Sequence, residues 1–339
     1  MRFGLGPLTI ESIAGKQHVD TYEEALEQAE IAERWGFDSV WVDERNFTPG
    51  AFNSSASVVG AAVAQRTTYV RVGLMPLAGL VNAIYVAEEV ACIDNISNGR
   101  VIVACGEPGE RVAAGWGGDA SVDRIRDDLA VMRKAWGPNP FNHHSPYHTI
   151  PAEMAVHTVA AGLHSISVQP KPAQLAVPLW MAGTSIAAEV AAAEALPFFG
   201  PAHLSLEELR PLYSRREPGP GEIVPLAREV FIARTGEEAH ESARPALERL
   251  YARLGEPADA GSGSFVDLAR DRFVIGDPEQ CIEQLYRYQH ELGVNYVVAR
   301  LAYHEMHAGE TARAIQLFGQ AVVPEFRMFG LPDEIRRLA

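Results

Sequence analysis

Cysteine, basic charge and long apolar runs are all scarce in this sequence. Its 339 residues include three widely spaced cysteines, Cys92, Cys105 and Cys281, with no C-x-x-C pair. That pattern excludes a disulfide framework and a zinc site of ordinary spacing, and it favours a reducing cytoplasm. No stretch approaches about 18 uninterrupted apolar residues, so we expect no membrane span. The opening run MRFGLGPLTI also lacks the long apolar region of a signal peptide.

Acidic residues outnumber basic ones, 44 against 29, which gives a formal net charge of −15. An acidic surface repels nucleic-acid backbones and anionic lipid headgroups, so we expect neither as a partner. A phosphate-bearing ligand would have to be held by local backbone donors. The hydrophobic content of 47% is ordinary for a globular protein and sufficient for a large core.

Short apolar runs alternate with longer amphipathic segments. The apolar runs predict strands over 2–8, 37–42, 69–75, 100–105, 177–182, 198–200, 224–233 and 294–301. The other segments predict helices over 20–35, 54–65, 84–96, 122–136, 185–195, 205–213, 235–254, 277–292 and 311–322. Side-chain caps mark several helix starts, and we expect capping at Thr21, Ser205 and Asp277.

Eight strand–helix units predict an α/β protein, a single (β/α)8 TIM barrel over residues 1–339. An open dinucleotide-binding sheet would need G-x-G-x-x-G after the first strand, whereas the chain has GLGPLTIE there. Two insertions interrupt the rhythm, at about 137–172 and 256–273. The first is rich in histidine, and we interpret it as a polar lid in which Tyr147 and His148 face a ligand, rather than as a metal site.

In such barrels the active site lies at the carboxyl ends of the strands. Gly183, Thr184 and Ser185 stand between the fifth strand and its helix. Glycine allows a close approach to the backbone, and the free amides of a helix start bind anions, so this turn is either a phosphate site or an ordinary helix N-cap, and position together with the family resemblance described below favours the phosphate site. Glu44 and Arg45 end the second strand. Glu44 could act as an acid or base if burial raises its pKa, whereas Arg45 stays protonated and could only orient a ligand.

Four blocks, in order, resemble the bacterial luciferase-like family of flavin and deazaflavin oxidoreductases. They are WGFDSVWVDERNF (35–47), AEEVACIDNISNGRVIVACGEPG (87–109), QPKPAQLAVPLWMAGTS (169–185) and GDPEQCIEQLYRYQHELGVNYVV (276–298). The second block is the strongest match, with its Ser-x-Gly-Arg turn at 97–100 before the strand. The resemblance implies a (β/α)8 barrel, usually dimeric, that binds reduced FMN or a deazaflavin.

The resemblance also assigns cofactor contacts. It implies that Leu74 and Met75 lie beneath the flavin ring, often joined by a cis peptide bond, and that Gly106 leaves room for the ring edge. Two positions depart from the family. Glu107 stands where many members carry an arginine that binds the phosphate, so Arg234 or Arg300 would have to replace it. Arg45 stands where the family has its catalytic histidine.

The resulting hypothesis is a monooxygenase that uses reduced FMN, supplied by a separate reductase, and O2 on a small organic substrate. A deazaflavin-dependent enzyme that transfers hydride without oxygen is one alternative. A non-catalytic barrel subunit is another, because the expected histidine and arginine are both missing. We predict no metal, a cytoplasmic location and a homodimer, and we place the catalytic groups at Glu44 and Arg45.

Overall fold

The computed structural model describes residues 1–11, 16–118, 120–152, 163–254, 265, 269, 271–303 and 306–328. One sheet of nine parallel strands has the order β10-β9-β11-β1-β2-β3-β4-β7-β8. The strands are β1 (Arg2–Leu5), β2 (Ser39–Asp43), β3 (Arg71–Met75), β4 (Val101–Gly106), β7 (Leu179–Ala182), β8 (Phe198–Phe199), β9 (Pro225–Ile232), β10 (Val274–Gly276) and β11 (Tyr296–Arg300). The α/β prediction is confirmed, and all eight predicted strands are present. Strand β10, directly after the predicted second insertion, is additional.

The two ends of the sheet come together at β9. A parallel bridge joins Gly200, just after β8, to Leu226, and the Ala227 amide donates to the Gly200 carbonyl at 3.0 Å. Strand β10 pairs only with 230–232 in the second half of β9. The sheet therefore curls round and encloses its inner face.

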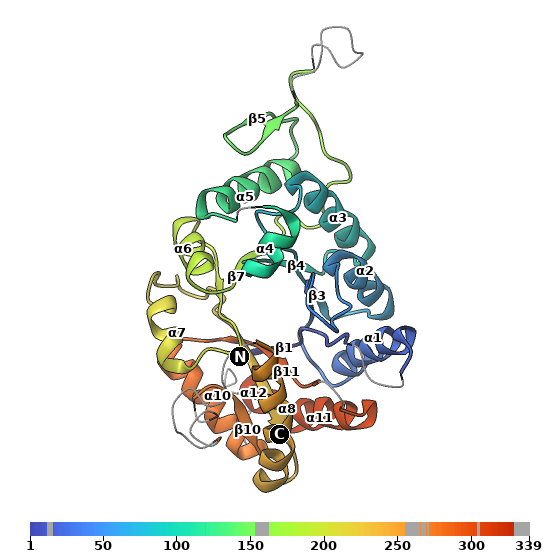
Figure 1. Cartoon of the computed structure of the whole chain (residues 1–339), viewed down its shortest axis with the longest axis vertical. Coiled ribbons are helices and arrows are strands. Elements are labelled where there is room, and N and C mark those ends of the chain that lie inside the picture. The colour runs from blue at the N-terminus through green and yellow to red at the C-terminus, as the bar shows by residue number, and fades with distance from the viewer. Residues whose placement is uncertain are drawn as a thin grey trace.

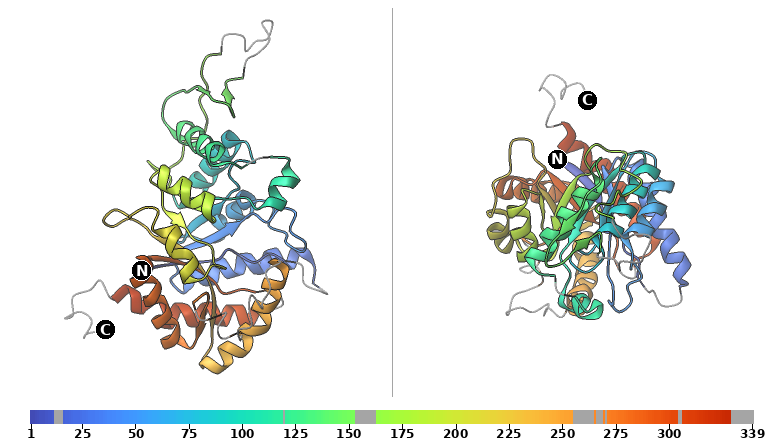
Figure 2. Two further views of the ribbon diagram at one scale, coloured as in Figure 1. Left: turned by 60° about the vertical axis from the view of Figure 1, so that its left-hand side comes forward. Right: turned by 90° about the horizontal axis from the view of Figure 1, so that it is seen from above.

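Helices surround the curled sheet (Figure 1). They are α1 (His18–Arg34), α2 (Ala56–Arg66), α3 (Ala83–Ile96), α4 (Glu110–Trp116), α5 (Val122–Trp136), α6 (Ser185–Ala193), α7 (Leu206–Tyr213), α8 (Gly236–Leu254), α10 (Pro278–Leu292), α11 (Ala308–Ala321) and α12 (Val323–Met328). The N-terminus and α12 lie at the end of the sheet opposite α4 (Figure 2). None of the helices in the described ranges is long and apolar enough to cross a membrane.

The predicted capping boxes are confirmed at Ser205, which starts α7, and at Asp277, which starts α10. The one at Thr21 is wrong. Helix α1 already begins at His18, so Thr21 lies within it, and its hydroxyl donates to the His18 carbonyl at 2.7 Å.

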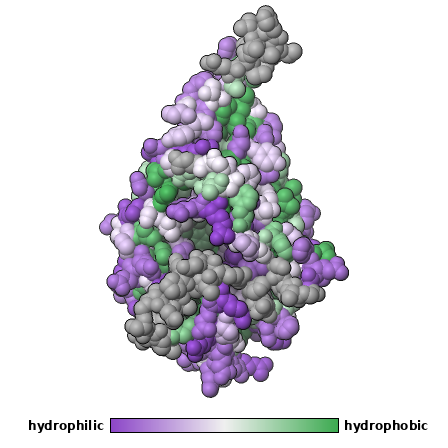
Figure 3. All heavy atoms as spheres, viewed as in Figure 1, coloured by the Kyte–Doolittle hydropathy of each residue, from purple (hydrophilic) through white to green (hydrophobic). Residues whose placement is uncertain are grey.

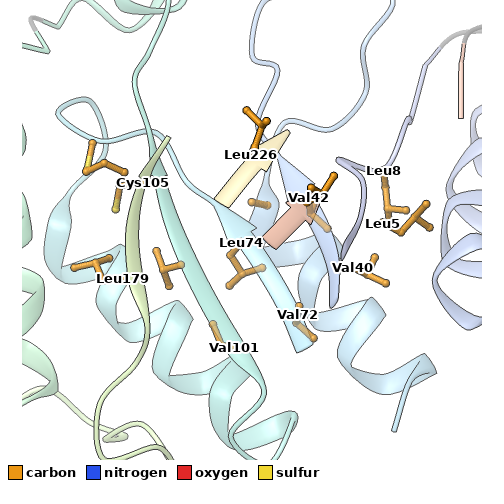
Figure 4. Packing of buried hydrophobic residues seen from close by; sticks show 14 of the residues in the cluster. Leu5, Leu8, Val40, Val42, Val72, Leu74, Val101, Cys105, Leu179 and Leu226 are labelled. Carbon is orange, nitrogen blue, oxygen red and sulfur yellow. The ribbon is translucent and has the colours of Figure 1, made fainter. Parts of the chain in front are cut away.

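Apolar side chains cover both faces of the sheet because strand residues alternate between faces. Val40, Val42, Val72 and Leu74 belong to the layer between the sheet and the helices (Figure 4). A second cluster fills the enclosed inner face with the intervening residues, among them Trp41, Ile102, Ala104, Trp180 and Val298. Inner-face residues at the carboxyl ends of the strands thus come together at one end of the enclosed inner face.

Candidate active site

The inner-face positions at the carboxyl ends of the strands form what we call the mouth. They are Asp43, Met75, Gly106, Ala182, Glu229 and Arg300. Helix α4 lies at this end of the sheet (Figure 2), and the same face is hollowed near its middle (Figure 3). Because parallel strands bring their carboxyl ends to one edge, side chains far apart in sequence share this opening.

Beneath the mouth lies an aromatic floor made of Trp41, Trp180, Phe199 and Tyr296. The ring centroids of Trp41 are 4.9 Å from Trp180 and 5.2 Å from Phe199, and those of Trp180 and Tyr296 are 5.2 Å apart. The Trp41 indole fits because residue 73 is glycine, where a Cβ would lie 2.2 Å from the indole. The floor closes the interior, so a ligand would lie above it, against surfaces that suit a planar ring.

One side of the mouth carries a charged band of five residues: Glu11, Asp43, Arg45, Glu229 and Arg300. Arg45 donates to Asp43 through Nε at 2.9 Å and to Glu11 through Nη1 at 3.0 Å. Arg300 approaches Glu11 at 3.7 Å and its strand neighbour Glu229 at 3.4 Å. The band joins the ends of β2 and β11, the interior of β9 and the chain after β1, and it contains three carboxylates and two guanidinium groups.

Two polar atoms of the charged band lack a hydrogen-bond partner in the described part of the chain. Glu229 Oε2 and Arg300 Nε are buried and have no hydrogen-bond partner within the described ranges. Burial opposes the charge of Arg45, but its partners Asp43 and Glu11 outweigh that effect and raise its pKa. Arg45 therefore stays protonated and cannot act as a base. Among the groups of this band, Arg45 is a fixed cation with 20% of its side chain exposed.

Glu44, predicted as an acid or base, points to the helix side of β2 and not to the mouth. Its carboxylate accepts hydrogen bonds from the Ala56 amide at 3.0 Å and the Leu77 amide at 3.3 Å. Burial raises its pKa, as expected, although these two bonds lower it. The prediction is corrected because strand alternation gives the mouth position to Asp43. Glu44 ties the start of α2 to the segment after β3.

Only one of the two residues predicted beneath the flavin ring reaches the mouth. Leu74 is buried in the outer layer, with 1% of its surface exposed, whereas Met75 packs against the inner cluster. The implied cis bond between them is also absent, because the cis bonds of the described ranges precede Pro7, Pro151 and Pro170. A Cβ at Gly106 would lie 3.6 Å from the Pro76 carbonyl oxygen, which is ordinary van der Waals contact.

The predicted phosphate site at the start of α6 is filled by the protein's own carboxylate. Glu107 accepts hydrogen bonds from the Thr184 amide at 2.7 Å, the Ala187 amide at 3.1 Å and the Thr184 hydroxyl at 3.1 Å. Gly183 makes room for Glu107, since a Cβ there would lie 2.5 Å from Glu107 Cβ. The donors sit where the sequence places them, but in this arrangement they do not fit a phosphate. Ser185 begins the helix and is exposed.

Neither proposed replacement for the family's phosphate-binding arginine is found near α6. Arg300 is committed to the charged band. Arg234 follows β9 and lines a separate groove with residues of α8 and α11. Cys105 packs in the core on the outer face of β4, where burial raises its pKa to about 12 and disfavours the thiolate.

In its described part, residues 137–152 and 163–172, the first insertion is not a lid, and residues 153–162 lie outside the described ranges. Its described part forms a hairpin of β5 (His143–His144) and β6 (Thr149–Ile150), which projects beyond α5 and away from the mouth (Figure 1). His143 bonds Asp127 at 2.8 Å and His148 bonds Asp128 at 2.5 Å, both aspartates on α5. These contacts hold the hairpin against the outer side of α5, so the lid prediction is wrong for Tyr147 and His148. No group of side chains in the described ranges is arranged to hold a metal ion.

Sequence reasoning assigned no role to three members of the charged band: Glu11, Asp43 and Glu229. Two of them carried a usable signal. Asp43 shares the period-two face of Ser39 and Trp41, and Glu229 lies within an otherwise largely apolar strand. Glu11 had none, because it lies in irregular chain after β1.

Comparison with known proteins agrees with this architecture. The family model described as luciferase-like monooxygenase matches residues 1–296. The oxygenase component of the flavin-dependent trigonelline monooxygenase of Acinetobacter baylyi is 28% identical over 163 residues, 44% of this chain and 43% of that protein. The uncharacterised protein y4wF of Sinorhizobium fredii is 29% identical over 118 residues, 34% of each chain. These matches span less than half of either relative.

Solved structures resemble the whole fold. Monooxygenase RslO1 from Streptomyces bottropensis has a TM-score of 0.83 and 22% identity, over 96% of this chain and 100% of that one. The oxygenating constituent of 3,6-diketocamphane monooxygenase from Pseudomonas putida, in complex with FMN, has a TM-score of 0.74 and 17% identity over 96% and 98%. The coenzyme F420-dependent tetrahydromethanopterin reductase of Methanopyrus kandleri has a TM-score of 0.69 and 17% identity over 96% and 99%. At these identities the likeness shows the fold.

Proposed function

The chain belongs to the luciferase-like monooxygenase family, and on that premise we propose that it is a flavin-dependent monooxygenase acting on a small organic substrate. A separate reductase would supply the reduced flavin. One oxygen atom of O2 would enter the substrate and the other would leave as water, with the flavin supplying two electrons. The hard chemistry belongs to the cofactor, and the protein's task is binding, orientation and exclusion of water.

The observation that carries the proposal is the division of the mouth into two halves. Met75, Gly106 and Ala182, on three neighbouring strands, form an apolar side that suits the face and edge of a flavin ring. The charged band on the other side suits a polar substrate. In this proposal eight strands close a (β/α)8 barrel in a single domain, with β10 appended. The homodimer stays a prediction.

Arg45 is the group we propose to orient the substrate or the reacting oxygen. Asp43 and Glu11 hold its guanidinium through Nε and Nη1, which leaves Nη2 without a partner in the described ranges. A guanidinium fixed in this way binds an anionic or carbonyl oxygen without losing much side-chain entropy. Asp43 and Glu11 are then positioning residues.

A matched pair of glycine substitutions tests where the ring binds. Gly106→Leu places a side chain into the mouth, whereas Gly109→Leu, three residues along, adds one where a Cβ meets nothing within 4 Å. We expect Gly106→Leu to weaken riboflavin binding at least tenfold, measured by quenching of ring fluorescence, and Gly109→Leu to leave it unchanged. Equal binding by both variants, with both folded, would place the ring elsewhere.

The same titration separates the competing functions. Binding of a deazaflavin but of no flavin would favour a hydride-transfer enzyme. Binding of neither ring would favour a non-catalytic subunit, a second candidate that the carboxylate at the start of α6 also supports. For the monooxygenase, oxygen-18 from labelled O2 must appear in the product once a substrate is found.

A further inference from the structure

We infer that Glu107 acts as a built-in anion at the start of α6, and that this chain consequently selects a flavin without a phosphate, such as riboflavin, over FMN. The inference rests on the proposed flavin-binding function. It concerns the α6 amide cluster, which we define as the backbone N–H groups of Thr184 and Ala187 together with the Thr184 hydroxyl.

All the donors of the α6 amide cluster point at one carboxylate. Three contacts of 2.7–3.1 Å bind Glu107, and they come from the N-cap residue of α6 and its first turn. The positive end of the helix reinforces these bonds. A carboxylate from β4 thus supplies the interactions that a bound phosphate would otherwise make at this helix.

The arrangement is fixed by the surrounding chain. The Glu107 amide donates to the Ala182 carbonyl at 2.7 Å, which fastens residue 107 to the end of β7. Gly183, at a φ of +144°, provides the space that the Glu107 side chain fills. Removing either the glycine or the carboxylate would spoil this fit.

The negative charge of Glu107 is what would discriminate between riboflavin and FMN. Glu107 forms no ion pair in the described ranges, so only amide and hydroxyl dipoles balance its charge. Arg215 reaches the first turn of α6 only through the Ser185 carbonyl, at 2.9 Å, from an exposed position. A flavin phosphate, which carries close to two negative charges at neutral pH, would have to displace Glu107 or lie beside it. The ribityl hydroxyls of riboflavin would meet no such repulsion.

The test compares riboflavin and FMN binding to the full chain and to three variants by fluorescence quenching. Glu107→Ala removes the carboxylate that accepts from the α6 amide cluster. Glu107→Gln keeps the side-chain size without the charge, in case the first variant folds poorly. Glu189→Ala removes an exposed carboxylate from the same helix as the control. We expect the unaltered chain to bind riboflavin at least as tightly as FMN, and Glu107→Ala to shift the ratio towards FMN at least tenfold.

A second readout needs no flavin. Inorganic phosphate should raise the melting temperature of Glu107→Ala and leave those of the unaltered chain and Glu189→Ala unchanged. An unaltered chain that binds FMN more than tenfold tighter than riboflavin, or equal shifts in Glu107→Ala and Glu189→Ala, would overturn the inference. Failure of both flavins to bind any variant would instead remove the proposed function, while the phosphate titration would still decide whether Glu107 blocks the amides.

Discussion

Removing the guanidinium of Arg300 should be among the most damaging single changes at the mouth. Arg300 and Glu229 are register partners on β11 and β9, and their side chains are only 9% and 5% exposed. Arg300→Met retains most of the apolar volume but removes the charge. Glu229 then loses its only ion-pair partner in the described ranges, whereas Glu11 keeps Arg45 at 3.0 Å.

The expected loss of stability in Arg300→Met follows from the burial of the Glu229 carboxylate, which no longer has an ion-pair partner among the described residues. Breaking a buried ion pair from one side typically costs about 3–5 kcal/mol, because the remaining charge is neither solvated nor paired. Unfolding entropy of about 2.1 cal/mol/K per residue, scaled to 339 residues, is about 0.7 kcal/mol/K. The melting temperature should therefore fall by about 4–7 °C.

A double variant distinguishes the loss of the pair from a general packing defect. Arg300→Met combined with Glu229→Leu removes both charges, and replacing a buried pair with apolar groups is often neutral or stabilising. We expect the double variant to recover most of the loss, measured by urea unfolding and by thermal melts. A single variant that costs under about 1 kcal/mol, or a double variant less stable than the single one, would refute the reasoning about a desolvated pair.

Two further predictions concern other parts of the chain. The Glu33 carboxylate accepts the backbone amides of Thr68 and Val70 at 2.8 and 3.0 Å and that of Tyr69, and although burial opposes its charge, these bonds lower its pKa below 4.5. The stabilisation by the Glu33 carboxylate should be complete above pH 4.5 and should fade as the pH falls through the lowered pKa. Glu33→Gln should therefore lower the free energy of unfolding by about 1–3 kcal/mol at pH 7 and by progressively less on acidification. Urea titrations at several pH values measure this difference. His148→Ala removes the hydrogen bond to Asp128, so it should speed proteolysis or amide exchange in the hairpin. It should leave the affinity for riboflavin within twofold. A large loss of affinity would instead support the prediction that the hairpin covers the ligand.

The sequence alone determined the strand–helix alternation and the α/β class. These follow from local chemistry, because apolar period and helix caps are encoded in neighbouring residues. The family followed from four ordered blocks and is confirmed by the match over residues 1–296. The turn between the fifth predicted strand and its helix also predicted the hydrogen-bond donors at Thr184.

Only the tertiary structure decided which side chain meets those donors. Glu107 and Thr184 are 77 residues apart, and the pairing of β4 with β7 brings them together. The same holds for the charged band, whose members lie up to 289 positions apart, from Glu11 to Arg300. Ion pairs and hydrogen bonds depend on distance in space and not on separation in sequence. A residue such as Glu107, which the sequence marks as unsuited to a phosphate site, therefore becomes the hydrogen-bond partner of that site in the folded chain.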